Sequence, residues 1–170
     1  MSLIIKEIDY QNSKDIYKLE SALKNWFSNP KDLNFADPDS KYPFDMKKWI
    51  NVNYKINKIR TVALYKDKWI IGFAGIKFLD ESNVAHISQI YVDKEHKGKG
   101  HKEFLIKEIE QITIKENINK LIITAMKKDQ SAQELFRKLS FKQAKITGNK
   151  ISFEKKLYLG INYLIGFTKS

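Results

Sequence analysis

The sequence contains no cysteine, and Arg60 and Arg137 are its only arginines. Without cysteine, disulfides, Cys-bound zinc and a cysteine nucleophile are all excluded, and so is an acyl-enzyme through sulfur. No apolar run approaches the ~20 residues of a membrane-spanning helix. The first residues, Met-Ser-Leu-Ile-Ile-Lys-Glu, lack the basic start, apolar centre and cleavage site of a signal peptide. We therefore expect a cytoplasmic protein that has no membrane partner.

Positive charge is abundant, but its form argues against a specific nucleic-acid site. The net charge is +11, with 31 lysines and arginines in total. Proteins that read bases and phosphates favour arginine for its planar fork. Here nearly all the cations are lysines, which are spread along the chain beside many isoleucines and asparagines. We interpret the charge mainly as a composition bias that would still attract anionic ligands at low salt.

Length and pattern predict one domain over residues 1–170, without repeats or linkers. Apolar periodicity and turn residues predict the element order β-α-α-β-β-β-α-β-α-β-β. Residues 28–43, which hold all three prolines, are predicted to be a loop. The conformation of residues 160–170 cannot be predicted. The expected strands cover residues 3–8, 60–65, 69–79, 84–92, 120–125, 141–147 and 150–159, and the expected helices start near residue 12 or 13, at 44, after 100 and at 129 or 131.

The most informative stretch covers residues 87–103, where an apolar β-type segment leads into a basic loop and then a helix. Gly98 and Gly100 let the backbone turn sharply and approach a ligand closely. The helix start behind them offers N–H groups and a positive dipole end. Lys97, Lys99 and Lys102 add full charges. The stretch predicts a phosphate or pyrophosphate site, although glycines spaced this way also occur in ordinary turns.

This stretch resembles the cofactor-binding motif of the GNAT superfamily, the acetyl-CoA-dependent N-acetyltransferases. In that family a strand ends in a small apolar residue and Arg/Gln-x-x-Gly-x-Gly/Ala follows. Val92 ends the strand here, Lys97 stands at the Arg/Gln place and Gly100 matches the glycine, whereas Lys102 departs from Gly/Ala. The resemblance covers roughly residues 3–157. It implies an α/β (α+β) fold with a mixed, mostly antiparallel central sheet flanked by helices, in which strands 4 and 5 splay apart.

A second resemblance begins at Asp129. The family often shows Asn-x-x-Ala-x-x-Leu-Tyr-x-Lys-x-Gly-Phe. At that spacing this chain has Asp129, Ala132, Leu135, Phe136, Lys138, Ser140 and Phe141. Phe136 replaces the tyrosine that protonates the departing CoA thiolate in many members, so that general acid is missing. Tyr91 and Ser131 are possible substitutes, but they are also explained as a packing residue and a helix cap.

The resemblance implies acetyl-CoA as co-substrate and no metal. All three histidines (His86, His96 and His101) lie within sixteen residues, but no carboxylate completes a ligand set with them. The cofactor-binding residues that the resemblance implies are Ile90, Tyr91, Val92, Lys97, Gly98, Lys99, Gly100, His101, Lys102, Asp129, Ala132 and Phe136.

The candidate catalytic residues are His86 and Tyr91. His86 stands six residues before Val92, where the family often carries a carboxylate, and counting places it on the same strand face as Ser88, Ile90 and Val92. Its reference pKa of about 6.5 suits a general base at neutral pH. A partly exposed strand histidine is the alternative, and Glu81 is a further candidate base. The resemblance also implies that a backbone N–H of Tyr91 or Val92 stabilises the developing oxyanion.

We therefore expect an N-acetyltransferase that moves an acetyl group directly from acetyl-CoA to a primary amine. The acceptor would be a small molecule or a peptide, and the protein a monomer or homodimer. Two alternatives stay open. One is a GNAT-fold module that binds acyl-CoA but is weak or inactive as a catalyst. The other is a basic nucleic-acid-binding domain.

Overall fold

The computed structural model describes residues 2–158, with the exception of the Asp80 side chain. The predictions for residues 159–170 therefore lie outside the described residues. The described chain forms two compact units, one of residues 2–77 and 88–105 and the other of residues 78–87 and 106–158. Strand β4 and helix α4 each contribute residues to both units. The expectation of a single domain stays a prediction.

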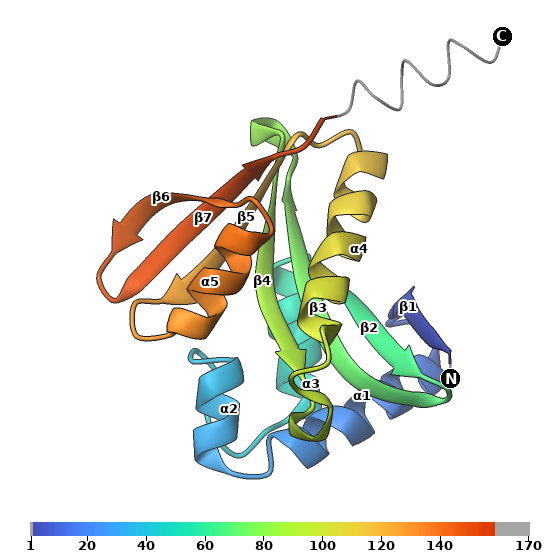
Figure 1. Cartoon of the computed structure of the whole chain (residues 1–170). Coiled ribbons are helices and arrows are strands. Elements are labelled where there is room, and N and C mark those ends of the chain that lie inside the picture. The colour runs from blue at the N-terminus through green and yellow to red at the C-terminus, as the bar shows by residue number, and fades with distance from the viewer. Residues whose placement is uncertain (1, 159–170) are drawn as a thin grey trace, which may run out of the picture. The chain divides into compact units, whose positions relative to one another are not determined.

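The strands form a mixed, mostly antiparallel sheet, which confirms the predicted fold class (Figure 1). Only the pairing of β4 with β5 is parallel among those with a described register. That register ends at Ile87↔Ile123, although β4 continues for five more residues. The strands are β1 (Leu3–Glu7), β2 (Arg60–Lys66), β3 (Trp69–Leu79), β4 (Val84–Val92), β5 (Lys120–Met126), β6 (Lys142–Thr147) and β7 (Lys150–Lys156), hydrogen-bonded in the order β1-β2-β3-β4-β5-β7-β6.

The helices agree with the prediction except for one addition. Among residues 2–158, no helix is long and apolar enough to cross a membrane. The helices are α1 (Ser13–Trp26), α2 (Pro30–Ala36), α3 (Met46–Trp49), which continues as the π-helix η1 (Ile50–Ile56), α4 (His101–Lys115) and α5 (Gln130–Lys138), with 3₁₀ turns η2 (Asp80–Ser82) and η3 (Lys94–His96).

Helix α2 occupies part of the segment predicted to be a loop, so that prediction is wrong over Pro30–Ala36. Asn29 caps the helix, because its Oδ1 accepts a hydrogen bond from the Asp32 backbone N–H at 2.9 Å. Pro30 follows at the start of the helix, where its missing N–H would have no partner in any case. Proline therefore begins a helix here rather than ending one.

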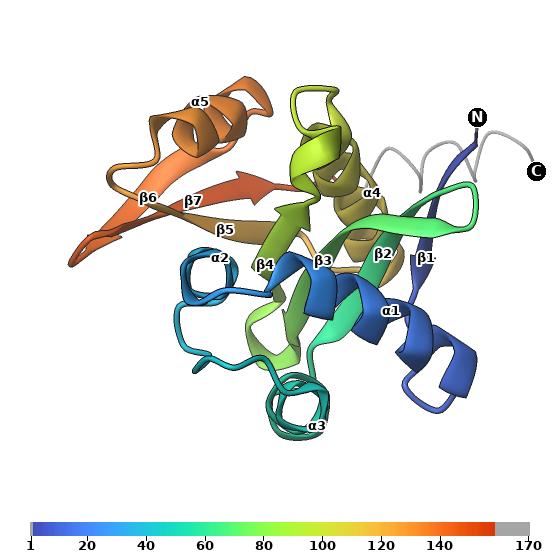
Figure 2. The same cartoon turned by 90° about the horizontal axis from the view of Figure 1, so that it is seen from below.

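The first unit has its core on one face of β2 and β3. Figure 2 shows α1, α2 and α3 gathered on one side of these strands. Tyr91 of β4 packs into the same core, whereas Leu105, in the second turn of α4, is buried on the other face. The core comprises Leu19, Leu23, Trp26 and Phe27 of the α1 region, Leu33, Met46 and Trp49 of the next helices, and Ala63, Tyr65 and Phe73 of the strands.

The second unit is built on the β5-β7-β6 ladder, against which α5 packs (Figure 1). Phe136 of α5 is buried with Phe141 and Phe153, at ring-centroid distances of 6.2 and 5.6 Å. Lys155 of β7 pairs with Glu110 of α4 at 2.9 Å. The predicted turn at Gly148-Asn149 joins β6 to β7, and Gly148 has a φ of +60°. This hairpin confirms the prediction.

Strand β4 does not alternate regularly between its two faces. Phe73 and Gly75 share a face of β3, since they are two residues apart. The Tyr91 ring lies 6.4 Å from Phe73, and a Cβ at Gly75 would lie 2.6 Å from Ser88 Oγ. Ser88 and Tyr91 therefore share a face although they are three positions apart, as one extra residue in a β-bulge would produce.

Val92 lies on the opposite face of the strand. A Cβ at Gly72 would lie 3.4 Å from Val92 Cγ2 and 3.5 Å from Leu105 Cδ1. The expectation that Ser88 and Val92 share a face is therefore wrong. Counting alternate residues back from Val92 therefore does not support the strand face that was predicted for His86.

The glycines of β3 provide a test of this close strand contact. A Cβ at Gly72 would lie 2.9 Å from the Tyr91 carbonyl oxygen, and one at Gly75 would lie 2.6 Å from Ser88 Oγ. We expect Gly72→Ala and Gly75→Ala each to lower the free energy of unfolding by about 1–3 kcal/mol, because both overfill a packed site. Urea denaturation measures this loss.

Second-site changes separate the two positions. Ser88→Ala removes the nearest atom to the new methyl group at Gly75, so it should restore part of the lost stability. Val92→Ala should restore little at Gly72, because the nearest atom there is a backbone oxygen. If Gly72→Ala leaves stability unchanged, the described approach of the two strands is wrong.

Candidate functional site

The glycine loop follows β4 directly and is held at both ends. The Asp93 N–H donates to the Ile71 carbonyl at 2.8 Å, which ties the end of β4 to β3. Asp93 then caps η3, since its Oδ1 accepts from the Glu95 N–H at 3.2 Å. At the far end, the Phe104 N–H donates to the Gly100 carbonyl at 3.0 Å, which begins α4. A short segment is thus fixed between a strand and a helix.

Gly98 and Gly100 both have positive φ angles, of 76° and 78°. A Cβ at either position would meet no heavy atom within 4 Å, so the space above both residues is open. The backbone conformation, rather than crowding, is therefore what requires glycine here. The first four N–H groups of any α-helix lack partners within the helix, and α4 begins at His101. This geometry suits an anion.

His101 contributes little to the positive charge of the loop. Burial lowers the pKa of His101, and the neighbouring His96, Lys99 and Lys66 lower it further by repulsion. The ring centroids of His96 and His101 are 6.1 Å apart. His101 is therefore neutral at pH 7, and lysines supply the formal charge of the loop. Within the described part of the chain, no group of three or more His, Cys, Asp or Glu side chains could hold a metal.

Tyr91 belongs to an aromatic cluster. Its ring lies 5.1 Å from Trp26 and 5.5 Å from Phe27, and the residue is only 6% exposed. Burial raises the pKa of its hydroxyl, and the negative charges of Asp32 and Asp93 raise it further. The hydroxyl therefore keeps its proton at neutral pH. The packing role considered for Tyr91 is observed, and its catalytic role stays a prediction.

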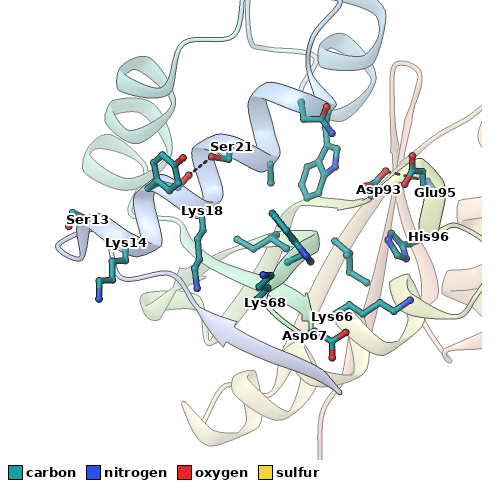
Figure 3. Close-up of a pocket in the computed structure, with 17 residues that line it drawn as sticks. Ser13, Lys14, Lys18, Ser21, Lys66, Asp67, Lys68, Asp93, Glu95 and His96 are labelled. Carbon is teal, nitrogen blue, oxygen red and sulfur yellow. Dashed lines mark hydrogen bonds between the residues drawn. The ribbon is translucent and has the colours of Figure 1, made fainter. Parts of the chain in front are cut away.

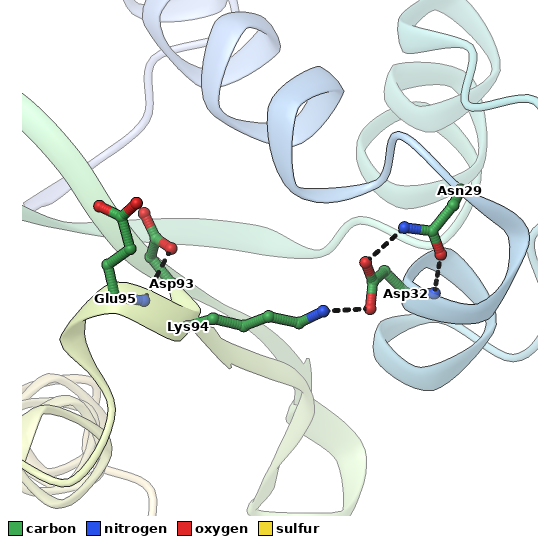
Figure 4. A network of polar contacts seen from close by, with 5 residues as sticks. All are labelled: Asn29, Asp32, Asp93, Lys94 and Glu95. Atoms are coloured by element: carbon green, nitrogen blue, oxygen red, sulfur yellow. Dashed lines mark hydrogen bonds and ion pairs between the residues drawn. The ribbon is translucent and has the colours of Figure 1, made fainter.

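Helix α2 is attached to the loop by two contacts. The first is an ion pair in which Lys94 Nζ lies 2.6 Å from Asp32 Oδ1 (Figure 4). At the start of α2, Asn29 Nδ2 donates to the other oxygen of the Asp32 carboxylate at 2.6 Å. The second contact is three residues further along both segments, where Lys97 Nζ lies 5.7 Å from the centre of the Phe35 ring. Local sequence patterns do not predict these contacts, because Lys94 and Asp32 are 62 positions apart in the chain.

The predicted residues His86, Asp129, Ala132 and Phe136 belong to the second unit. Asp129 caps α5 by accepting a hydrogen bond from the Ala132 N–H at 3.0 Å. Phe136 is 2% exposed and serves as core. His86 is partly buried in the paired section of β4, opposite Ile122 of β5. Their cofactor and catalytic roles stay predictions. Sequence reasoning missed Gln133, whose buried amide donates to the carbonyls of Met126 and Lys127.

A separate cavity lies in the first unit between α1 and the β2–β3 hairpin, and it encloses about 1200 Å³ (Figure 3). Glu95 and His96 of η3 form part of its lining. Gly98 and Gly100 do not line it, so the cavity and the open face of the glycine loop are distinct features that share η3.

The ion pair between Lys94 and Asp32 can be tested by titration. Hydrogen bonds from Lys94 and then Asn29 hold the pKa of Asp32 below its ordinary value of about 3.9. The pair therefore contributes to stability above that ordinary pKa, and the contribution is lost as the pH falls through the lowered value. We expect Lys94→Met to raise the pKa of Asp32, as measured by ¹³C NMR of its carboxyl carbon.

Lys31→Met is the matched control. Lys31 is the weakest of the groups that lower this pKa, so removing it should change the pKa little. An equal rise in the two variants would show that general positive charge, and not the contact with Lys94, sets the pKa of Asp32.

Several solved structures share this fold at low sequence identity. The PaiA N-acetyltransferase of Thermoplasma acidophilum, solved in complex with coenzyme A, is 20% identical with a TM-score of 0.66, and the match covers 92% of this chain and 99% of that one. An acetyltransferase from Elizabethkingia anophelis with acetyl-CoA bound is 16% identical with a TM-score of 0.66, over 91% and 98% of the two chains. The IAA acetyltransferase of Bacillus cereus is 16% identical with a TM-score of 0.67, over 92% and 100%.

A comparison with curated protein sequences gives no match. A sequence model of the Acetyltransferase (GNAT) family, in contrast, matches residues 20–141. That range includes all of β4, the glycine loop and α5. The chain therefore belongs to the GNAT acetyltransferase family.

Proposed function

We propose that this protein is an N-acetyltransferase that transfers an acetyl group from acetyl-CoA directly to a primary amine. The observation that carries the proposal is the loop before α4. Gly98 and Gly100 have left-handed backbone conformations there, and the space above both residues is open. The solved relatives that contain coenzyme A or acetyl-CoA support the choice of cofactor. Family membership supports the reaction class.

The loop residues would hold the pyrophosphate of the cofactor. Backbone N–H groups of residues 97–102 can donate to phosphate oxygens, because glycine at both left-handed positions leaves no side chain above the backbone. Lys97 and Lys99 are exposed and add positive charge. The neutral His101 can donate or accept a hydrogen bond there without adding charge.

The bound cofactor would supply the reactive acetyl thioester. We assign hydrogen-bond donation at the reacting carbonyl to the backbone N–H of Tyr91 or Val92. His86 would take the proton that the acceptor amine loses. The Tyr91 hydroxyl, whose raised pKa keeps it protonated, is the candidate donor of a proton to the leaving thiolate. The acceptor is proposed to be an amine of a small molecule or a peptide.

One observation favours a second candidate function, a module that binds acyl-CoA with little turnover. Phe136 has no hydroxyl, and it is buried between Phe141 and Phe153. The tyrosine that serves as general acid in the family motif is therefore absent at position 136. Release of free CoA in the presence of a panel of primary amines distinguishes the enzyme from the module.

Gly100→Glu tests the cofactor site. A carboxylate placed over the loop would repel pyrophosphate, and like charges at such a site cost several kcal/mol, so we expect CoA affinity to fall about 100-fold or more. Isothermal titration calorimetry measures the affinity.

Gly148→Glu is the matched control, because Gly148 also has a positive φ, of +60°, and open space above it. Both variants should lose similar stability, about 1–2 kcal/mol from the left-handed backbone. Only Gly100→Glu should lose CoA affinity. Unchanged CoA affinity in Gly100→Glu would contradict the assignment of the loop.

His86→Gln tests the proposed base. Glutamine keeps polarity and reach but cannot take the proton, so we expect kcat to fall about 100-fold or more, with KM for acetyl-CoA nearly constant. The loss should shrink at high pH, where more of the acceptor amine is already deprotonated. Steady-state kinetics over a range of pH measure both effects.

Glu81→Gln is the companion variant, because the exposed Glu81 is the alternative base. It should leave the pH–rate profile unchanged. If Glu81→Gln abolishes the fall in rate at low pH and His86→Gln does not, the two assignments are reversed.

A further inference from the structure

The cavity between α1 and the β2–β3 hairpin has the size and lining of a small-molecule site. Its volume of about 1200 Å³ is slightly above the usual range for ligand pockets, about 300–1,000 Å³. One wall is the exposed side of α1, the other is the hairpin, and the residues around η3 close one end (Figure 3). All lining residues belong to the first unit.

The base of the cavity is apolar and the rim carries two aromatic rings. Trp26, Ile70 and Ile71 are buried side chains that form the base. Tyr17 on α1 is 72% exposed and Trp69 on the hairpin is 68% exposed. Large exposed rings on both walls can stack on a flat ligand and cover its faces. The shape and lining therefore favour an aromatic body.

Lysine side chains line both walls of the cavity. Lys14 and Lys18 extend from α1, and Lys66 and Lys68 from the hairpin (Figure 3). Among the side chains that the structure describes, none of these four lysines forms an ion pair. The ammonium of Lys18 instead lies 5.7 Å from the centre of the Tyr65 ring, and that of Lys68 lies 5.5 Å from that of Trp69.

Negative charge limits how much anion the cavity can hold. Asp93 and Glu95 stand at the η3 end, and Asp67 lies in the hairpin turn (Figure 3). A ligand with several phosphates would approach these carboxylates and be repelled. A single anionic group can be held near the lysines while the apolar body extends over the base. The charge distribution therefore favours a monoanion.

We propose that this cavity binds a flat aromatic molecule that carries one carboxylate. The ring lies over Trp26, Ile70 and Ile71, between Tyr17 and Trp69, and the carboxylate faces Lys18 and Lys68. This site is separate from the glycine loop. The proposal depends neither on acetyl transfer nor on cofactor binding, and its test uses the protein without cofactor.

The probe is 2-naphthoate, titrated into the full-length protein by calorimetry. The location of binding is followed by the Trp69 indole N–H in ¹H–¹⁵N spectra, assigned with the Trp69→Phe variant. We expect binding with a shift of this resonance. We also expect Lys18→Glu/Lys68→Glu to weaken binding about tenfold or more, because charge-assisted contacts are replaced by repulsion.

The control double variant, Lys142→Glu/Lys145→Glu, makes the same charge change on the exposed strand β6 of the second unit. It should leave the affinity for 2-naphthoate within twofold of the original. A cation of similar shape, 2-naphthylmethylammonium, should bind the original protein more weakly than 2-naphthoate does and should gain affinity in Lys18→Glu/Lys68→Glu.

Three results would overturn the proposal. The first is no binding of 2-naphthoate at millimolar concentration. The second is binding that leaves the Trp69 indole resonance unchanged. The third is an equal loss of affinity in the two double variants, which would mean that net charge alone attracts the probe. Loss of CoA binding or acetyl transfer in other variants would not affect this outcome.

Discussion

The structure around the candidate site depends on how closely the backbones of β3 and β4 approach each other. A Cβ at Gly72 would lie 2.9 Å from the Tyr91 carbonyl, so only glycine fits the observed spacing. At this point Tyr91 turns into the aromatic cluster beside α1 and Val92 faces Leu105 of α4. Two consecutive residues of one strand thus anchor both faces of the first unit. The next residue, Asp93, is fixed to Ile71 by a backbone hydrogen bond. The glycine loop therefore starts from a rigid point.

Much of this arrangement could be predicted from local sequence. The glycines of the loop, the turn at Gly148 and the helix start near residue 12 or 13 each depend on the conformation or hydrogen bonding of a few adjacent residues, and each is observed. The predicted range of β4 agrees with the structure at both ends. These features were predictable because residues that are neighbours in sequence determine them.

Other features depend on contacts that sequence spacing does not reveal. The three prolines of residues 28–43 predict a loop, whereas Pro30 follows a capping asparagine and begins helix α2. The irregularity in β4 defeats an argument from strict alternation, because one extra residue exchanges the two faces of a strand. Phe136 has the spacing of a cofactor residue, and that spacing does not reveal that its ring also packs against Phe141 and Phe153. The Asp32–Lys94 pair joins segments far apart in the sequence.

The contacts of α2 also bear on how the loop can bind an anion. Lys94 pairs with Asp32, and its hydrogen bond is the main cause of the lowered pKa of that carboxyl. The ammonium of Lys97 lies over the Phe35 ring, which gives it a weak attraction that a phosphate can replace. If an anion draws Lys97 toward itself, one of the two contacts between α2 and the loop is lost while the ion pair remains. Binding at the loop and the position of α2 are then linked, and the linkage acts equally in both directions.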